Sequence, residues 1–128
     1  MDKEAVRTEA APAPFQGAPY SQAVKANGLV FVSGQLSLRP GEKELTGGDV
    51  AAQTEQVFAN LRAILEEAGT SLDNLVKTTV FLQNLGDFGA MNEVYARHVG
   101  DRPPARSTVE VAKLPSGALV EIEAIAVL

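Results

Sequence analysis

The sequence predicts an α+β domain in which two helices pack on one face of a single mixed β-sheet. Three observations lead to this prediction. The chain has 128 residues, the usual length of one domain, and 45% of them are hydrophobic, which is enough to form a core. Two segments carry apolar residues at helical spacing, and five short segments carry the β-branched or alternating patterns of strands. Their order, β-β-α-β-α-β-β, is typical of an α+β domain.

Residues 1–14 are expected to form a flexible tail, followed by a single domain over residues 15–128. Residues 10–14 read Ala-Ala-Pro-Ala-Pro, and prolines at this spacing cannot continue a helix. The first two strands then form a predicted hairpin, with segments 21–25 and 29–33 on either side of Asn27-Gly28. Asn-Gly suits the positive φ angles of a type I′ turn.

The strongest periodic signal predicts a first helix. Thr46 or Asp49 can cap its start, and Gly69 can end it. Its apolar residues recur at steps of three and four and form one stripe: Val50, Thr54, Val57, Phe58, Leu61, Ile64, Leu65 and Ala68.

The second half of the chain alternates strand and helix. Residues 75–82 are rich in β-branched side chains, which favours a strand. Asp87 can cap a second helix, which ends before Pro103-Pro104. One side of this helix carries Phe88, Met91, Tyr95, His98 and Val99.

The last two strands are predicted over residues 106–111 and 119–127, and both alternate in polarity. Both faces of the final strand carry apolar side chains, yet two helices can cover only one face of the sheet. Another copy of the chain is the economical cover for the second face, so we expect a homo-oligomer.

Composition excludes several kinds of chemistry. The chain has no cysteine and one histidine, which excludes disulfides, thiolate catalysis and a multi-histidine metal site. Chemistry in this chain must therefore come from carboxylates, arginine, tyrosine, hydroxyls, amides or the backbone. The formal charge of -5 disfavours nucleic acid as a partner. No apolar run is long enough to span a membrane, and the start of the chain lacks the apolar core of a secretory signal, so a cytoplasmic location is predicted.

Charged residues inside apolar strands are the candidates for a functional site. The guanidinium of Arg106 offers a planar fork of donors that matches a carboxylate. Glu121 in an apolar strand is expected to have a raised pKa, which suits a general acid or base. Glu123 lies in the same strand. The structural alternatives are an ion pair between Arg106 and Glu121, a Lys–Glu pair, or exposure to solvent, and spacing alone favours these.

Other polar residues are weaker candidates. Tyr20 can donate a hydrogen bond, although a packing role is commoner. Ser33-Gly34 can present backbone N–H groups, although a bulge is the ordinary reason for such a glycine. Asn92 is expected to be exposed, near the start of its helix. The serines have no His and Asp partners, which argues against a serine hydrolase.

Six segments together resemble the RidA family, reactive intermediate deaminase A, also called the YjgF or translation-initiation-inhibitor family. The resemblance extends from about residue 14 to the C-terminus. The segments are Ala18-Pro19-Tyr20-Ser21-Gln22-Ala23, Val32-Ser33-Gly34-Gln35, Val76-Lys77-Thr78-Thr79-Val80-Phe81-Leu82, Met91-Asn92-Glu93-Val94-Tyr95, Pro104-Ala105-Arg106-Ser107 and Val120-Glu121-Ile122-Glu123-Ala124-Ile125-Ala126-Val127.

This resemblance implies a chorismate-mutase-like α+β fold, assembled as a homotrimer with a site in each cleft between subunits. The implied activity is hydrolysis of enamines and imines, such as 2-aminoacrylate, 2-iminopropanoate and 2-iminobutanoate, to 2-oxo acids and ammonia. This activity protects pyridoxal-phosphate enzymes from those intermediates. The family uses no metal or cofactor.

The resemblance also implies roles for individual residues. Arg106 matches the arginine that clamps the substrate carboxylate, and Glu121 matches the glutamate that positions the attacking water. The positions that line the cleft are matched by Tyr20, Ser33, Gly34 and Asn92. Thr108 stands where many members have Cys, and a contribution through its backbone carbonyl would tolerate that change.

Three alternatives stay open at this point. The chain could be a ligand-binding module, although the presence of Arg106 favours the deaminase. A ribonuclease or translation inhibitor is a second alternative, against which the acidic charge argues. A third is a more specialised deaminase, whose substrate would be set by side chains that the sequence does not place in space.

Overall fold

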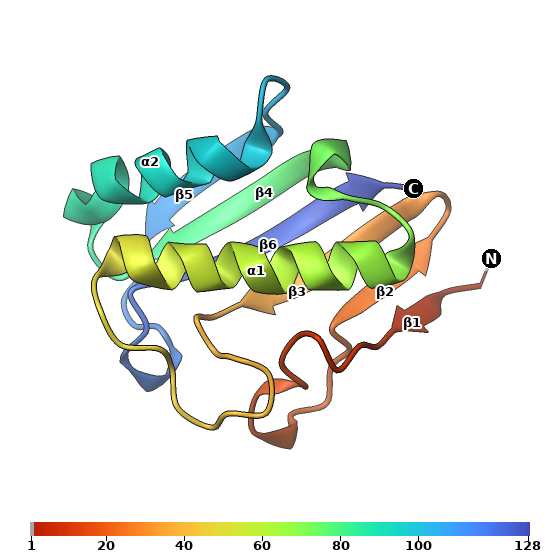
Figure 1. Ribbon diagram of the computed structural model, residues 1–128, viewed down its shortest axis with the longest axis horizontal. Helices are drawn as coiled ribbons and strands as arrows, with labels where there is room; N and C mark the ends of the chain where they lie inside the picture. Colours follow the sequence, from red (N-terminus) through yellow and green to blue (C-terminus); the bar gives the residue numbers. More distant parts are fainter. Residues whose placement is uncertain (1) are drawn as a thin grey trace.

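The computed structural model describes residues 2–128, and within them one six-stranded sheet is covered on one side by two α-helices (Figure 1). The strand order across the sheet is β1-β2-β3-β6-β4-β5. The elements are β1 (Glu4–Val6), β2 (Ala23–Ala26), β3 (Leu29–Gln35), α1 (Val50–Ala68), β4 (Leu75–Leu82), α2 (Phe88–Val99), β5 (Ala105–Glu110) and β6 (Val120–Val127).

The sheet is mixed, as predicted. Neighbouring strands are antiparallel except β4 and β5, which are parallel and are joined through α2. Parallel neighbours need a long crossover, and a helix on the face of the sheet supplies it. The last strand in the chain, β6, lies in the centre of the sheet between β3 and β4.

The hairpin of β2 and β3 forms at the predicted turn. Asn27 has φ 53° and Gly28 has φ 77°, the two positive values that a type I′ turn requires. The register pairs Ala26 with Leu29 next to the turn. Asn and Gly adopt this conformation more easily than other residues, and the prediction is confirmed.

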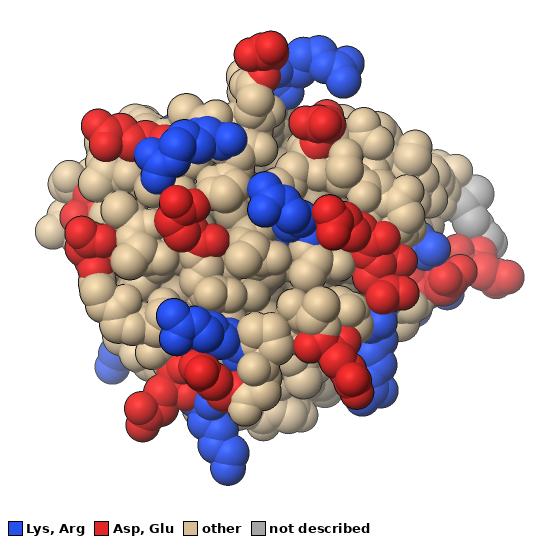
Figure 2. All heavy atoms as spheres, viewed as in Figure 1, with Lys and Arg blue, Asp and Glu red and all other residues tan. Residues whose placement is uncertain are grey.

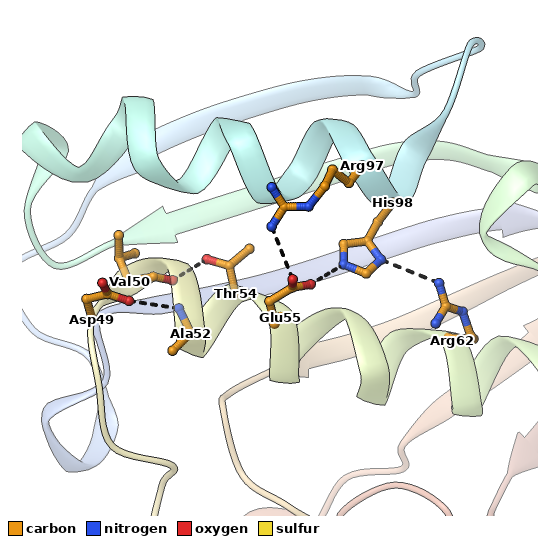
Figure 3. Close-up of polar contacts among 8 residues, drawn as sticks. All are labelled: Asp49, Val50, Ala52, Thr54, Glu55, Arg62, Arg97 and His98. Carbon is orange, nitrogen blue, oxygen red and sulfur yellow. Dashed lines mark hydrogen bonds and ion pairs between the residues drawn. The ribbon is translucent and has the colours of Figure 1, made fainter.

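Helix α1 matches its predicted bounds and caps. The Oδ1 atom of Asp49 accepts a hydrogen bond from the Ala52 N–H at 2.9 Å (Figure 3). Gly69 ends the helix with φ 94°. The predicted apolar stripe is buried over its whole length. It packs on β3 and β6, which places the centre of the core beneath this helix.

Helix α2 begins after Asp87 as predicted, but Asp87 does not cap it. The Asp87 side chain makes no capping hydrogen bond. A 3-10 turn (Leu85–Asp87) precedes the helix, and Asn84 Oδ1 accepts from the Gly86 N–H there at 2.8 Å. The chain therefore enters α2 through a turn that is capped by Asn84 and not by Asp87.

A polar cluster joins the outer sides of α1 and α2 (Figure 3). Arg97 Nη2 donates to Glu55 Oε2 at 3.1 Å, and His98 Nε2 donates to Glu55 Oε1 at 2.5 Å. Arg62 donates to His98 Nδ1 at 3.4 Å, so Nε2 is the ring nitrogen that carries the proton given to Glu55. The imidazole also stacks on Phe58, with ring centroids 4.6 Å apart. This cluster, named here the Glu55 clasp, ties the two helices together.

The N-terminal segment differs from the expected flexible tail. Residues 4–6 form β1, which pairs with β2, and Val6 and Ala11 are buried in the core. The side chain of Gln22 accepts from the Thr8 N–H at 2.8 Å and donates to the carbonyls of Thr8, Ala11 and Pro12. Proline excludes a helix here, but it does not exclude a segment whose backbone is bonded by a side chain distant in the sequence.

The face of the sheet away from the helices remains open in the single chain. On β6, Val120, Ile122, Ala124 and Ala126 are buried beneath the helices, as the alternation predicted. The opposite face presents apolar side chains to solvent, among them Phe31, Val109 and Val127. Exposed apolar surface of this extent is typical of an interaction surface.

Within residues 2–128, neither helix combines the length and the apolar character needed to cross a membrane.

Candidate functional site

The seven predicted site residues lie in two groups on opposite faces of the sheet. Tyr20, Ser33, Gly34 and Glu121 line one cavity, named here the Glu121 pocket. Arg106, Thr108 and Asn92 lie on the other side, at the edge of the sheet where β5 is next to α2.

Strand register explains this separation. Arg106 on β5 is paired with Thr78 on β4, and Thr78 is buried beneath α2. Glu121 on β6 is paired with Phe81. Side chains alternate between faces along a strand, so Thr78 and Phe81 point to opposite faces of the sheet, and so do their partners.

The Glu121 pocket has a volume of about 620 Å³. Its floor is formed by β3 and β6, and the loop residues Leu36 and Leu38 supply an apolar side. The N-terminal segment, including Phe15, forms another wall. The cavity therefore combines a carboxylate with apolar surroundings.

Glu121 fits into this pocket because β3 is irregular at the neighbouring position. The register of β3 with β6 shifts between Val32 and Gln35, which is the bulge expected at Ser33-Gly34. A Cβ atom on Gly34 would lie 2.9 Å from Cδ of Glu121, so only glycine leaves room for the carboxylate in this position.

The electrostatic environment of Glu121 matches the prediction of a raised pKa. Burial raises the pKa of its carboxyl group, and the nearby negative charge of Glu123 acts in the same direction. Within residues 2–128, Glu121 has neither an ion-pair partner nor a hydrogen-bond partner. The predicted alternatives of an Arg106–Glu121 or Lys–Glu pair are therefore wrong for the single chain. A half-buried carboxylate without a partner is suited to hold water or a substrate group.

Tyr20 and Ser33 differ in what they can offer a ligand. Tyr20 Oη accepts a hydrogen bond from the Phe15 N–H at 2.5 Å, which leaves the hydroxyl hydrogen available in the pocket. Ser33 Oγ donates its hydrogen to the Ser21 carbonyl at 2.6 Å. Tyr20 is therefore the free hydroxyl donor, whereas the Ser33 hydroxyl retains only acceptor capacity.

Arg106 is held by aromatic rings. Its guanidinium carbon lies 4.6 Å from the ring centroid of Tyr95 and 5.4 Å from that of Phe88, both on α2. Among residues 2–128 no carboxylate forms an ion pair with it. The predicted structural ion pair is thus not found in the described chain, and the guanidinium donors stay available for an anion.

Asn92 lies on α2, and Thr108 lies two residues after Arg106 on the same strand, β5. Asn92 is half-buried on α2 rather than exposed, which corrects the prediction, and its Oδ1 atom is buried without a hydrogen-bond partner in residues 2–128. It lies one helical turn after Phe88. Thr108 is half-buried on β5 and is paired with Val80. An unpartnered buried amide oxygen is a group that a ligand donor can satisfy.

Three residues that support these groups were missed in the sequence. Tyr95 and Phe88 were assigned to an apolar helix side, and their spacing from Arg106 carries no signal of contact. The sequence pattern assigns Gln22 no role of its own, yet its four hydrogen bonds fix the N-terminal wall of the Glu121 pocket. Gln22 follows Ser21 and precedes β2, and these sequence neighbours carry no sign of this role.

Charge and metal-binding groups limit the chemistry further. On the face covered by the helices, basic and acidic side chains are interspersed, without an extended basic patch (Figure 2). That face therefore lacks the continuous positive surface that binds a phosphate backbone. In the described part of the chain, no three His, Asp or Glu side chains are grouped to hold a metal ion.

Comparison with known proteins identifies the family to which this fold belongs. The family model described as Endoribonuclease L-PSP matches residues 8–128. The chain is 49% identical over 128 residues to Reactive Intermediate Deaminase A, chloroplastic, of Arabidopsis thaliana, covering 100% of this chain and 67% of that protein. It is 43% identical over 125 residues to 2-iminobutanoate/2-iminopropanoate deaminase of Mus musculus, covering 98% and 91%.

Solved structures agree with these sequence matches. The crystal structure of E. coli TdcF with bound serine superposes with a TM-score of 0.89 at 39% identity, covering 98% of each chain. Other relatives are named only as RutC family proteins. The chain belongs to the Endoribonuclease L-PSP family, which includes the RidA and RutC proteins, and the predicted resemblance to RidA is confirmed.

Proposed function

We propose that this protein hydrolyses 2-imino acids, among them 2-iminopropanoate and 2-iminobutanoate, to 2-oxo acids and ammonia. The observation that carries the proposal is the guanidinium of Arg106, which is held on aromatic rings without a carboxylate partner in residues 2–128. A guanidinium in this state suits a substrate carboxylate. The name of the mouse relative supports the same reaction.

The proposed chemistry needs little from the protein because an imine carbon is already electrophilic. Arg106 binds the carboxylate and fixes the distance of the imine carbon from Glu121. The Glu121 carboxylate takes a proton from water as the water oxygen bonds to that carbon, while the C=N π electrons move to nitrogen. The nitrogen takes that proton from Glu121 to give a carbinolamine. The carbinolamine hydroxyl then passes its proton to nitrogen by way of Glu121, an oxygen electron pair forms the C=O bond, and the C–N bond breaks to release ammonia and leave the 2-oxo acid. An enamine such as 2-aminoacrylate enters after protonation of its terminal carbon.

The raised pKa of Glu121 suits this role. A carboxyl group whose pKa is raised by burial is a stronger base when ionised than an exposed one, and it returns the proton more readily than water does. Tyr20 supplies a hydroxyl donor in the same pocket, and Asn92 supplies an unpartnered amide oxygen near Arg106. We place Ser33, Gly34 and Thr108 in the substrate-binding set through their backbone groups.

A complete site in this proposal needs two subunits. Arg106 and Glu121 point to opposite faces of one sheet, so one chain cannot bring them to the same ligand. A homotrimer in which the open sheet faces meet would cover the exposed apolar surface. It would also bring the Arg106 edge of one subunit to the Glu121 pocket of the next.

The test is release of 2-oxo acid from freshly generated imines. A pyridoxal-phosphate dehydratase acting on serine or threonine supplies 2-aminoacrylate or 2-iminobutanoate, and the wild-type protein is compared with Arg106→Ala and Arg106→Lys. We expect acceleration over spontaneous hydrolysis, and a loss of about 2–4 kcal/mol of transition-state binding in both variants. Unchanged turnover in the variants, with the oligomer intact, would contradict the role of Arg106.

The same preparation should also be incubated with single-stranded RNA at low salt, because the family model carries an endoribonuclease name. If the protein cleaves RNA and accelerates the hydrolysis of neither imine, a nuclease function would replace the proposed deaminase function. Acceleration only with imines of larger side chain would point to a more specialised deaminase.

A further inference from the structure

We propose that Tyr95 is the residue that positions Arg106 for binding of the substrate carboxylate, and that Thr78 fixes Tyr95 in turn. The proposal rests on the function proposed above, because it assumes that Arg106 receives the carboxylate. Tyr95 acts through Arg106 and is a positioning residue, not a catalytic one.

The contact with Tyr95 is closer and better supported than the contact with Phe88. The guanidinium carbon lies 4.6 Å from the Tyr95 ring centroid, compared with 5.4 Å for Phe88. Tyr95 is 5% exposed and Phe88 is 41% exposed. The buried ring is therefore the fixed surface, and the exposed ring covers the guanidinium from the solvent side.

Two contacts hold the Tyr95 ring in one orientation. Its hydroxyl is hydrogen-bonded to Thr78 Oγ1 at 2.6 Å, and Thr78 is 1% exposed in the centre of β4. Its ring packs edge-on against Phe58, with centroids 5.4 Å apart and an angle of 81° between the rings. Tyr95 itself is a buried residue of α2. Because the Tyr95 ring is fixed in this way, it cannot adjust to the side chain of Arg106. The ring therefore sets the orientation of the Arg106 guanidinium.

An aromatic support keeps the donors of Arg106 free, which a carboxylate support would not. A carboxylate partner would occupy two N–H groups and neutralise the charge that the substrate needs. A ring face attracts the cation through its quadrupole and leaves the N–H groups in the guanidinium plane unused. Arg106 occupies the edge strand of the sheet, where it would otherwise have several solvent-exposed rotamers. The ring therefore supplies orientation without competition for the ligand.

The test compares ligands with and without the carboxylate. Binding of 2-oxobutanoate and of its uncharged amide, 2-oxobutanamide, is measured by calorimetry for the wild type, Tyr95→Phe and Tyr95→Leu. We expect Tyr95→Leu to weaken the binding of 2-oxobutanoate about five- to thirtyfold and to leave the binding of the amide nearly unchanged. Tyr95→Phe keeps the ring and should retain most of the affinity. In turnover assays the same loss should appear in KM more than in kcat.

Val99→Ala is the matched control, because Val99 is buried on the same helix but carries no aromatic ring that could support a guanidinium. Both Val99→Ala and Tyr95→Leu should lower the melting temperature, and only Tyr95→Leu should lower affinity for the carboxylate. If Tyr95→Leu does not fold, Thr78→Val tests the same proposal, because it preserves the shape of the side chain and removes the hydroxyl that fixes Tyr95. It should raise KM about two- to fivefold. Equal weakening of acid and amide, or no weakening of either, would overturn the proposal.

A readout independent of activity separates this proposal from the proposed function. The side-chain protons of Arg106 lie over an aromatic face and should show upfield NMR shifts in the wild type and Tyr95→Phe. These shifts should be lost in Tyr95→Leu. If they are present but no imine is hydrolysed and 2-oxobutanoate does not bind, the proposed function fails while the support of Arg106 by Tyr95 stands. Absence of the shifts in the wild type would overturn the support itself.

Discussion

Gly34 on β3 leaves the space that the carboxylate of Glu121 on β6 occupies. A Cβ atom at Gly34 would lie 2.9 Å from Cδ and 3.2 Å from Cγ of Glu121. The backbone of Gly34 does not have a positive φ, so the requirement for glycine at this position comes from the neighbouring side chain and not from backbone strain.

Gly34→Ala should therefore displace Glu121 while the fold is retained. The atoms that a methyl group would meet belong to the end of a flexible side chain, which can rotate away. We expect kcat to fall about a hundredfold, because a misplaced general base loses most of its effect. The measurement is imine turnover together with thermal unfolding.

Gly47→Ala is the control for this substitution, since an added Cβ there would meet nothing within 4 Å. It should keep wild-type turnover. If Gly34→Ala is as active as Gly47→Ala, Glu121 does not need its present position.

Glu121→Gln should make the protein more stable at neutral pH and inactive. Burial raises the pKa of Glu121 above its ordinary value of 4.5, so the unfolded chain releases this proton at lower pH than the folded chain does. Ionisation of this carboxyl group therefore lowers the free energy of unfolding as pH rises from 4.5 through the pKa of the folded state. The loss of stability persists at every pH above that pKa. The glutamine variant does not carry that cost.

The measurement is urea unfolding of both proteins at one fixed concentration, above and below this pH window. The advantage of Glu121→Gln should be present near neutral pH and absent where both side chains are uncharged. An advantage that is equal at every pH would show that titration of Glu121 is not its source.

The sequence predicted those parts of the fold that depend on local interactions. The apolar stripe of α1, its cap at Asp49 and the Asn27-Gly28 turn are determined by residues within a few positions of one another, and all three were predicted correctly. Strand β1 was missed because three residues of mixed polarity carry no pattern. Its position depends on pairing with β2 and on the bonds of Gln22 to the segment that follows.

The site could be predicted only as a set of residues. Alternation placed Arg106 and Thr108 on one face of their strand, but nothing in an edge strand of mixed polarity tells which face the helices cover. The opposite orientation of Glu121 follows from the central position of β6 in the sheet, and that position depends on pairing between distant segments. Asn92 was expected in solvent because its neighbours in sequence do not reveal how α2 is rotated.

Gln22→Leu should loosen the N-terminal wall of the Glu121 pocket. The substitution keeps volume but removes hydrogen bonds to the backbone of Thr8, Ala11 and Pro12 in a buried setting. We expect a loss of about 2–4 kcal/mol in the free energy of unfolding, together with faster proteolysis within residues 8–16. Denaturant unfolding and mass spectrometry of protease digests measure both effects. Unchanged protection of that segment would mean that Gln22 is not its anchor.

Glu55→Gln should weaken the Glu55 clasp in a way that depends on pH. The hydrogen bonds from His98 and Arg97 lower the pKa of Glu55 below its ordinary 4.5, so its contribution is present above pH 4.5 and is lost as pH falls through the folded value. Because the carboxylate is largely exposed, the loss at neutral pH should be at most about 1 kcal/mol. Unfolding curves of both proteins should converge in acid, and a constant difference across pH would contradict this contribution.

Two inactive variants should restore activity when they assemble together, if the site lies between subunits. Arg106→Ala removes the carboxylate-binding group and leaves the Glu121 pocket intact, whereas Glu121→Gln does the reverse. The two side chains point to opposite faces of one sheet, so an intact pair must take Arg106 from one subunit and Glu121 from its neighbour.

In a cyclic assembly with random mixing at equal amounts, about a quarter of the sites combine an intact Arg106 with an intact Glu121. The two proteins are unfolded together, refolded as a mixture and assayed for imine turnover against each variant refolded alone. We expect the mixture to reach about a quarter of wild-type activity and each variant alone to stay near the spontaneous rate. A mixture as inactive as its components, with mixed oligomers verified by native mass spectrometry, would place Arg106 and Glu121 in different sites. The carboxylate clamp and the water-activating base would then have to be sought among residues of a single face.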